Sequence, residues 1–302
     1  MKEILKIVLS LTAVCVAAAL ILGAVFAKTE HIRKENEEKL REETIQSLLG
    51  YGTGVKKPGD LNIFDVHRYV ITDDKGTTVL GYLLPLKEKG FALAEIDLSG
   101  KPGKVIPVTA NAAQLAEPSS RDAAINAALP QGSKATYAET LSIANLGDKR
   151  LGYVVPGSTQ GFKEAIKLMV SLDPDFNVTG MAIVEAKEDP GLGAEIQQDY
   201  FRNQFVGKTV DLLKSLKVIK EPLPTDYLEV LEPAKAKKIG LTQDQIREIK
   251  QKHVKDDIYA LTGATISSRA VTNGVKDTVR KFVYRLDILT GALKQDKLQV
   301  AF

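Results

Sequence analysis

An uninterrupted apolar run near the amino terminus constrains the fold of this chain more than any other feature. Residues 7–27, IVLSLTAVCVAAALILGAVFA, contain no charged side chain. As an α-helix, a run of this length would span about 32 Å at about 1.5 Å per residue, enough to cross the hydrocarbon core of a bilayer. The sequence therefore predicts a transmembrane segment within residues 1–27 and a folded part that begins after it.

The flanks of this run allow two interpretations. Lys2 and Lys6 precede it, which fits a retained signal anchor with a cytoplasmic amino terminus. Val25-Phe26-Ala27 is an acceptable cleavage pattern for a signal peptide. Because the apolar cores of signal peptides are only about 7–15 residues long, the length favours the anchor. Both interpretations place residues 28–302 outside the cytoplasm.

Composition excludes several classes of function. The 302 residues include 41 Lys and Arg against 38 Asp and Glu, a balance unlike the clustered positive charge of a nucleic-acid binder. A single cysteine, Cys15, excludes an internal disulfide and an iron–sulfur cluster held by this chain alone. His31, His67 and His253 show no ligand spacing, so a histidine metal site is not expected. Any redox chemistry would need an organic cofactor.

After the apolar run, residues 28–50 are rich in charge with sparse apolar positions, which predicts a solvated helical stalk; a partner-binding helix is the alternative. Glycines at 50, 52 and 54 end that helix.

Residues 69–72 and 79–85 flank the turn sequence DDKG and predict a hairpin. A helical pattern over 119–129 stops at Pro130. The phrase GYLLP at 81–85 returns as GYVVP at 152–156, so residues 51–151 are either an α/β insertion or a partial repeat.

The second half of the chain has a clearer pattern. Residues 166–172 alternate between apolar and other side chains and predict a half-buried strand, with 178–185 as its partner. In the following loop, KEDPGLGAEI, Pro190-Gly191 suits a type II turn and Gly193 allows a close backbone approach. This loop is not a dinucleotide fingerprint, because the third glycine is missing.

Residues 259–286 carry the strongest chemical signal. Apolar side chains recur at helical spacing from Ala270 to Leu286, and Ser267 or Ser268 is predicted to cap the helix. Before the cap lie small residues and hydroxyls next to the positive end of a helix dipole, which suits a phosphate. The structural alternative is a plain turn and cap.

Three elements of the sequence resemble one family. TGATISSRAV at 262–271 resembles the flavinylation motif of the FMN-binding domain family, in particular its members in Rnf electron-transport complexes and in sodium-translocating NADH:quinone reductases. EDPGLG at 188–193 resembles the family's Glu-Thr-Pro-Gly-Leu-Gly loop, and QFVGK at 204–208 resembles its Gln/His-Phe-x-Gly-Lys element. The resemblance covers residues 1–50 and about 152–285, whereas 51–151 match poorly.

This resemblance implies a covalent cofactor. In the family, the last threonine of the motif carries FMN through a phosphoester, and that residue here is Thr265. A flavin transferase, which takes FMN from FAD, would read the motif. The implied cofactor-binding residues are Thr262, Gly263, Ala264, Thr265, Gly191, Leu192 and Gly193. The resemblance implies neither a catalytic residue nor a metal ligand.

Two positions depart from the family pattern. Tyr259 stands where the motif usually has an aspartate, with Asp256 and Asp257 just upstream. Asp189 replaces the usual threonine of the glycine loop, and its charge is expected to lie near the flavin and to lower its potential.

The expected fold is α+β: an N-terminal transmembrane helix and a helical stalk, then an antiparallel-sheet FMN-binding domain with an extra β-rich insertion. The predicted divisions are the anchor 1–27, the stalk 28–50, the insertion or partial repeat 51–151, the FMN-binding domain 152–290 and a tail 291–302.

The resemblance also implies a function. It implies an electron-transfer subunit of a membrane-bound Rnf-type complex that couples ferredoxin and NAD redox chemistry to ion translocation, and that does not act alone. The implied location is a bacterial cytoplasmic membrane, crossed once, with the amino terminus inside and most of the chain on the outer face. The alternatives are a stand-alone extracytoplasmic FMN shuttle and a flavin-free adaptor or assembly protein; Tyr259 supports the latter.

Overall fold

A computed structural model describes residues 1–88 and 90–302, and the side chains of residues 27, 31 and 34 lie outside the described part. The proposed cleavage residue Ala27 and the histidine at 31 therefore carry no side-chain description. The chain forms two compact units, residues 1–46 and 47–302.

The apolar run and the charged stalk form one helix, α1 (Lys2–Leu48). Its 47 residues correspond to about 70 Å at about 1.5 Å per residue. Among the described residues, α1 is the one helix long and apolar enough to cross a membrane. In the stalk, Lys39 lies 2.9 Å from Glu35 one turn away, an exposed pair that favours the helix. The helix ends just before Gly50, whose φ of +90° suits glycine.

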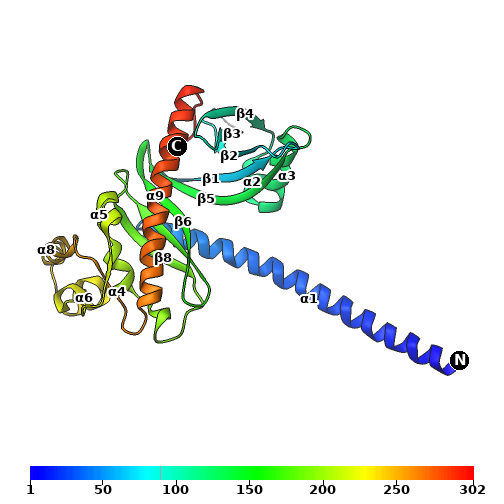
Figure 1. Cartoon of the computed structure of the whole chain (residues 1–302), viewed down its shortest axis with the longest axis horizontal. Coiled ribbons are helices and arrows are strands. Elements are labelled where there is room, and N and C mark those ends of the chain that lie inside the picture. The colour runs from blue at the N-terminus through cyan, green and yellow to red at the C-terminus, as the bar shows by residue number, and fades with distance from the viewer. Residues whose placement is uncertain (89) are drawn as a thin grey trace. The chain divides into compact units, whose positions relative to one another are not determined.

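Residues 47–302 are built around one eight-stranded sheet (Figure 1). The strands are β1 (Leu61–Thr72), β2 (Thr78–Pro85), β3 (Phe91–Asp97), β4 (Pro102–Val108), β5 (Lys134–Leu146), β6 (Lys149–Gln160), β7 (Ala165–Leu172) and β8 (Val178–Glu185). Their order is β4-β3-β2-β1-β5-β6-β7-β8, and every neighbouring pair is antiparallel. The predicted α+β fold with an antiparallel sheet is confirmed. Residues 51–151 contribute five of its eight strands, β1 to β5, and the beginning of β6.

The sheet consists of two four-stranded meanders that meet where β1 pairs with β5. The phrases GYLLP and GYVVP lie in the second strand of each meander, β2 and β6. Asp97 closes the turn between β3 and β4 by accepting hydrogen bonds from N–H groups two and four residues later. Asp173 closes the equivalent turn between β7 and β8 in the same way. The two halves of the sheet therefore share a strand order and a turn, and whether residues 51–151 are an insertion or a partial repeat stays a prediction.

Both faces of β2 are buried, which explains its continuous apolar run. Leu83 packs in a core that includes residues of α2 (Ala112–Ala116) and α3 (Pro118–Ala128). Tyr82 and Leu84 point to the opposite face and join the main core with α9 (Thr265–Gln295). Because successive strand residues alternate between faces, a strand covered on both sides needs apolar residues throughout.

The predicted amphipathic helix is confirmed as α9, which lies across β6 and β7 (Figure 1). It continues to Gln295, so the expected division after residue 290 falls inside the helix. Beyond it the chain returns to the first meander: Val300 bridges to Leu86, and the ring of Phe302 lies 6.2 Å from that of Phe64.

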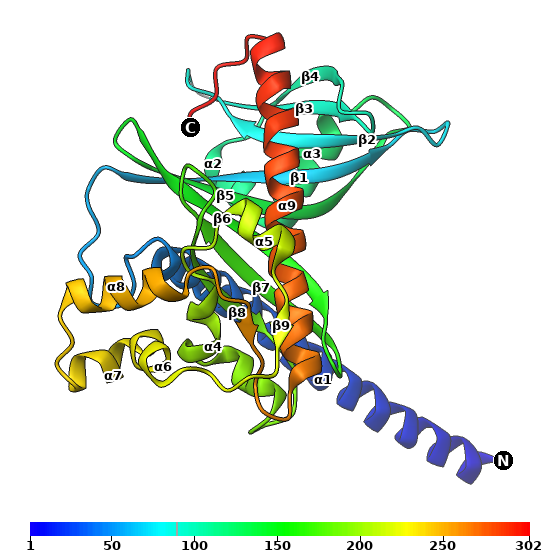
Figure 2. The same cartoon turned by 60° about the vertical axis from the view of Figure 1, so that its left-hand side comes forward.

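Short elements connect β8 to α9. They are η1 (Gly193–Gln197), α4 (Asp199–Arg202), η2 (Asn203–Phe205), α5 (Val210–Ser215), β9 (Val218–Ile219), α6 (Thr225–Leu231), α7 (Pro233–Lys238), α8 (Gln243–His253) and β10 (Ile258–Tyr259). Helices α6, α7 and α8 group at the end of this unit away from α2 and α3 (Figure 2). Tyr227, Val230, Leu231 and Tyr259 form their own small core. This group leads the chain to the start of α9.

Close contact between α9 and the sheet predicts a site-specific effect of side-chain size. A Cβ at Gly274 would lie 3.0 Å from Thr159 atoms of β6, whereas nothing lies within 4 Å of a Cβ at Gly291 on the same helix. We expect Gly274→Leu to lower the free energy of unfolding by about 1–3 kcal/mol or more relative to Gly291→Leu, because overpacking forces the helix from the sheet. Thermal unfolding of both variants in detergent tests this; equal stabilities would contradict it.

Candidate functional site

The loop after β8 meets the segment before α9. Leu192 N–H donates to the Asp189 carbonyl at 3.1 Å and Gly191 has a φ of +72°, which confirms the predicted type II turn. Gly263 has a φ of +75°, and a Cβ there would lie only 2.8 Å from Leu192 Cδ2. Only glycine fits this conformation and this contact. Two loops that are distant in sequence are therefore packed together.

The carboxylate of Glu188 joins three segments of this site. Its Oε1 accepts hydrogen bonds from the N–H groups of Phe162 (3.0 Å) and Lys163 (3.2 Å), and its Oε2 accepts one from the Ser267 hydroxyl. Glu188 is only 8% exposed. A Cβ at Gly193 would lie 2.7 Å from the same carboxylate, which confirms the predicted close approach at this glycine. Sequence reasoning quoted Glu188 within a motif but gave it no role.

The prediction that Ser267 or Ser268 caps α9 is wrong. The helix begins at Thr265 with Ala264 at the N-cap position. Ser268 Oγ accepts from Leu261 N–H at 3.0 Å and donates to the Ala264 carbonyl, while Ser267 bonds Glu188. Both hydroxyls face inward because they satisfy buried neighbours.

The start of α9 consequently offers backbone donors. In the part of the chain that the structure describes, no side chain caps this helix. The N–H groups of a helix's first turn have no intrahelical partner, and they favour an anion. Thr265 is the first helical residue and half-buried, so its hydroxyl lies beside these groups.

A groove of about 800 Å³ opens at Thr265. It is lined by Gly191, Glu195, Tyr200, Gln204, Lys220, Glu221, Pro222, Leu223, Leu228, Glu232, Tyr259, Ala260, Leu261, Thr262, Gly263 and Thr265. Of the predicted site residues, Thr262, Gly263, Thr265 and Gly191 thus lie on one groove. Leu192 covers Gly263 beside it, and Ala264 and Gly193 are buried behind it. The volume falls within the range of about 300–1,000 Å³ for small-molecule sites.

Aromatic rings and acidic groups surround the groove. The Tyr200 hydroxyl donates to Glu195 Oε2 at 3.1 Å, and burial together with this carboxylate raises the pKa of Tyr200 to about 12. Asp189, which was expected to bring charge to the site, instead pairs with Lys163 at 2.5 Å, and this contact raises the pKa of Lys163. Its charge is therefore compensated locally, and its effect on a cofactor stays a prediction.

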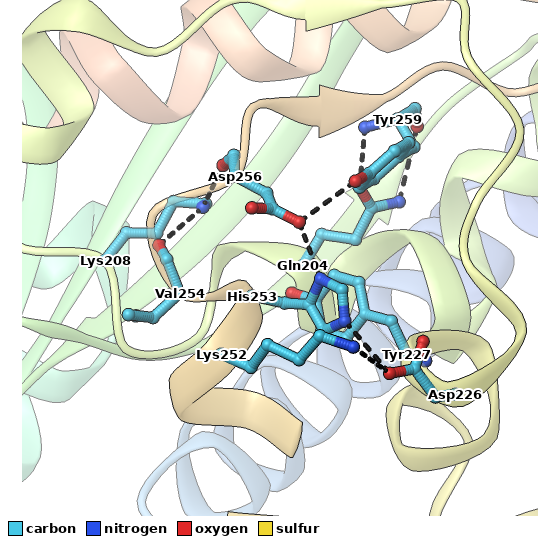
Figure 3. Close-up of polar contacts among 9 residues, drawn as sticks. All are labelled: Gln204, Lys208, Asp226, Tyr227, Lys252, His253, Val254, Asp256 and Tyr259. Carbon is cyan, nitrogen blue, oxygen red and sulfur yellow. Dashed lines mark hydrogen bonds and ion pairs between the residues drawn. The ribbon is translucent and has the colours of Figure 1, made fainter. Parts of the chain in front are cut away.

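Tyr259, the departure from the family motif, is linked to a carboxylate. It is 9% exposed, and its hydroxyl donates to Asp256 Oδ2 at 2.9 Å (Figure 3). The same oxygen lies 2.6 Å from His253 Nδ1. Burial, reinforced by Asp256, raises the pKa of Tyr259 to about 12. Position 259 has no carboxylate, but the carboxylate of Asp256, three residues upstream, contacts the Tyr259 side chain.

The QFVGK element contacts the same segment. Gln204 Oε1 accepts from Tyr259 N–H at 2.8 Å, and Nε2 donates to the Tyr259 carbonyl at 3.3 Å (Figure 3). Lys208 Nζ donates to the carbonyls of Val254 (3.0 Å) and Asp256 (2.6 Å). The resemblance had marked this element, but its contacts follow only from the fold.

Among the described residues, no three His, Cys, Asp or Glu side chains converge in a way that could hold a metal ion.

Comparison with known proteins identifies the class of this site. Residues 161–280 match the FMN-binding domain family. The chain therefore contains an FMN-binding domain, and the prediction of FMN as cofactor is confirmed. The residues fit FMN, since a hydroxyl and free helix N–H groups suit its phosphate and the tyrosine-lined groove can take a flat ring.

The relatives come from ion-translocating complexes. The chain is 36% identical over 138 residues to the G subunit of the proton-translocating ferredoxin:NAD(+) oxidoreductase complex of Clostridium ljungdahlii, covering 46% of this chain and 57% of that one. It is 29% identical over 133 residues to the G subunit of the Na(+)-translocating ferredoxin:NAD(+) oxidoreductase complex of Acetobacterium woodii, covering 44% and 49%. The chain spans about half the length of the curated relatives it matches.

Solved structures give a more distant likeness. The crystal structure of Shewanella oneidensis NqrC is matched with a TM-score of 0.42 and 16% identity, covering 80% of this chain and 91% of that one. The C subunit of the Na(+)-translocating NADH-quinone reductase of Parabacteroides distasonis is matched with a TM-score of 0.33 and 22% identity, covering 49% and 62%.

The three bonds of Glu188 predict a marked loss of stability when the carboxylate is removed. Glu188→Ala would leave three donors on two segments, the N–H groups of Phe162 and Lys163 and the Ser267 hydroxyl, without this acceptor, at a cost of about 1–3 kcal/mol for each donor that stays buried. Glu185 nearby makes an exposed ion pair with Lys167, so Glu185→Ala is a matched control that should leave the stability nearly unchanged. Denaturant unfolding of both variants gives the comparison, and similar losses would refute the role of Glu188.

The buried amine of Lys208 predicts a pH-dependent stability. Burial lowers the pKa of Lys208 to about 8 in the folded chain, against about 10.4 for an unperturbed lysine. Below about pH 8 both states bind the proton; between about pH 8 and 10 only the unfolded chain does, so stability rises with pH there. The gain is about 2 kcal/mol at about 1.36 kcal/mol per unit. Lys208→Met should abolish this rise, and unfolding free energies measured from pH 7 to 10 test it.

Proposed function

We propose that Thr265 carries FMN as a phosphoester. The single observation that supports this most strongly is the position of Thr265, at the first residue of an uncapped helix and on the groove of an FMN-binding domain. A flavin transferase would supply the group from FAD. The Thr265 Oγ–phosphorus bond forms, the pyrophosphate bond of FAD breaks, AMP leaves and the hydroxyl proton passes to solvent. No electron is transferred in this step.

The surroundings give each neighbouring residue a role in this proposal. Thr262, Gly263 and Ala264 form the small turn that exposes the hydroxyl to the transferase, and the first N–H groups of α9 then bind the phosphate. Gly191, Leu192 and Gly193 border the cofactor from the opposite loop. Once bound, FMN supplies reversible electron transfer. The rings of Tyr200 and Tyr259 line the groove, and Glu195, Glu221 and Glu232 together with Lys220 would set the charge around the cofactor.

We further propose that the protein is an electron-carrying subunit of a membrane-bound Rnf-type complex that couples ferredoxin and NAD chemistry to ion translocation. The relatives are subunits of such complexes by name. The chain would pass electrons between other subunits. In α1 it has a helix that can anchor it once in the membrane. We place the amino terminus in the bacterial cytoplasm and residues 47–302 on the outer face, because Lys2 and Lys6 precede the apolar run.

Variants of Thr265 with and without a side-chain hydroxyl test the covalent link. The chain and variants are co-expressed with a flavin transferase, and the peptide containing Thr265 is analysed by mass spectrometry. The native chain and Thr265→Ser, which keeps a hydroxyl, should gain the mass of an FMN phosphoester. Thr265→Val, which keeps the shape and loses the hydroxyl, should show no flavin fluorescence after denaturation. An unmodified native peptide would favour the flavin-free adaptor instead.

Orientation is tested by labelling single cysteines. In a Cys15→Ser background, Asp148→Cys places a thiol at the exposed turn between β5 and β6, and Glu3→Cys places one before the apolar run. A membrane-impermeant maleimide added to intact spheroplasts should label the first variant and should label the second only after lysis. The reverse pattern would contradict the proposed orientation.

A further inference from the structure

The segment that leads into the attachment turn has little secondary structure of its own. Between the end of α8 at His253 and the start of α9 at Thr265, the two residues of β10 form the regular part. β10 pairs with the equally short β9. Such a segment needs other contacts to fix its position, and side chains of the QFVGK element supply them (Figure 3).

Lys208 holds the beginning of this segment. Its ammonium donates to the carbonyls of Val254 and Asp256, at 3.0 and 2.6 Å, and the residue is only 1% exposed. Both of these partners are uncharged carbonyl groups, and the described part of the chain shows no ion pair of Lys208 with a carboxylate. A cation buried in this way is costly, and a methionine would fill the same space without that cost. Packing alone therefore does not explain a lysine here.

The surroundings make this buried amine tolerable. Val254 follows the last residue of α8, so Lys208 donates at the C-terminal end of that helix, where its dipole favours a cation. Asp256 and Asp257 act on it through space and oppose the lowering of its pKa by burial. The surroundings of Lys208 therefore favour a donor that hydrogen-bonds carbonyl groups of this one segment.

Gln204 holds the end of the same segment. It is 2% exposed, and its amide bonds both the N–H and the carbonyl of Tyr259. Gln204 and Lys208 lie on one short stretch, and they bind the leading segment at residues 254, 256 and 259. The His253, Asp256 and Tyr259 side chains add a second set of bonds. Thr262 follows Tyr259 by three residues.

We propose that Lys208 and Gln204 are positioning residues for flavin attachment: they fix the segment before the Thr262–Thr265 turn so that the Thr265 hydroxyl is presented to the transferase. This inference rests on the proposed attachment at Thr265. Both side chains bond backbone groups of residues 254–259 rather than Thr265, and Gln204 also lines the groove. Their loss would leave the sheet and the hydroxyl intact and lower the fraction of chains in which the turn has its reactive geometry.

The test uses the full-length chain in detergent as the substrate of a purified flavin transferase with FAD. The rate of FMN incorporation is measured as a function of chain concentration for the native protein, Lys208→Met and Gln204→Met. We expect kcat/KM to fall tenfold or more in both variants. A decrease of this size corresponds to the loss of one or two buried hydrogen bonds that hold the turn in its reactive geometry. Lys208→Arg, which keeps donors for carbonyls, should recover part of the loss.

Lys276 provides a matched control. It lies on α9 away from the turn, and its Nζ also donates to a backbone carbonyl, that of Leu216, at 2.8 Å. Lys276→Met should lower the melting temperature without changing kcat/KM for attachment. If Lys208→Met and Gln204→Met are modified at the native rate, the proposal is wrong. The proposal is also wrong if attachment to Lys276→Met is slowed as much as attachment to these two variants. The rate of attachment would then follow the stability of the chain and not the position of the turn.

Two failures are distinguishable in this design. If the native chain gains no FMN, the proposed attachment itself fails. If the native chain is modified and the two variants match it, only the positioning role fails. Should Lys208→Met not fold, Gln204→Met decides the question, because it removes no charge and keeps a side chain of similar length.

Discussion

The carboxylate of Glu188 accepts hydrogen bonds from two backbone N–H groups of the loop between β6 and β7 and from a hydroxyl in the first turn of α9. Its burial is tolerable because these donors satisfy it. Gly161 and Gly193 approach it so closely that a Cβ at either position would lie within 3 Å of its atoms. The sheet, the glycine loop and the start of α9 are thus fixed relative to one another by one side chain, and the groove at Thr265 depends on that.

A second group of buried polar contacts fixes the other side of the groove. Lys208 and Gln204 bind backbone groups, whereas Asp256 links the Tyr259 hydroxyl to His253, whose ring stacks on Tyr227 at 4.5 Å. Bonds to backbone groups set where the segment runs, and bonds between side chains set which way Tyr259 points. Together they allow a segment without regular structure to hold a small-residue turn in place.

The two meanders have the same arrangement of strands, but the chain that follows each of them forms a different structure. Both have the same strand order and the same aspartate turn before the last strand. After β4, residues 109–111 lead directly into α2, whose helix only covers the sheet. After β8, the chain enters the glycine loop and the group of short helices that surrounds the groove. The likeness between the two meanders is therefore confined to the strands and their turns, and the groove is built from the chain that follows the second meander.

The sequence by itself determined the membrane-spanning length of α1, the strand and helix periodicities, the type II turn at Pro190-Gly191 and the class of cofactor. These features depend on neighbours in the sequence or on short motifs, so local patterns reveal them. The position of the helix start at Thr265, the inward bonds of Ser267 and Ser268, and the roles of Glu188, Gln204 and Lys208 were decided only by the tertiary structure. A buried polar side chain is defined by the groups that satisfy it, and here those groups lie up to 79 residues away in the chain.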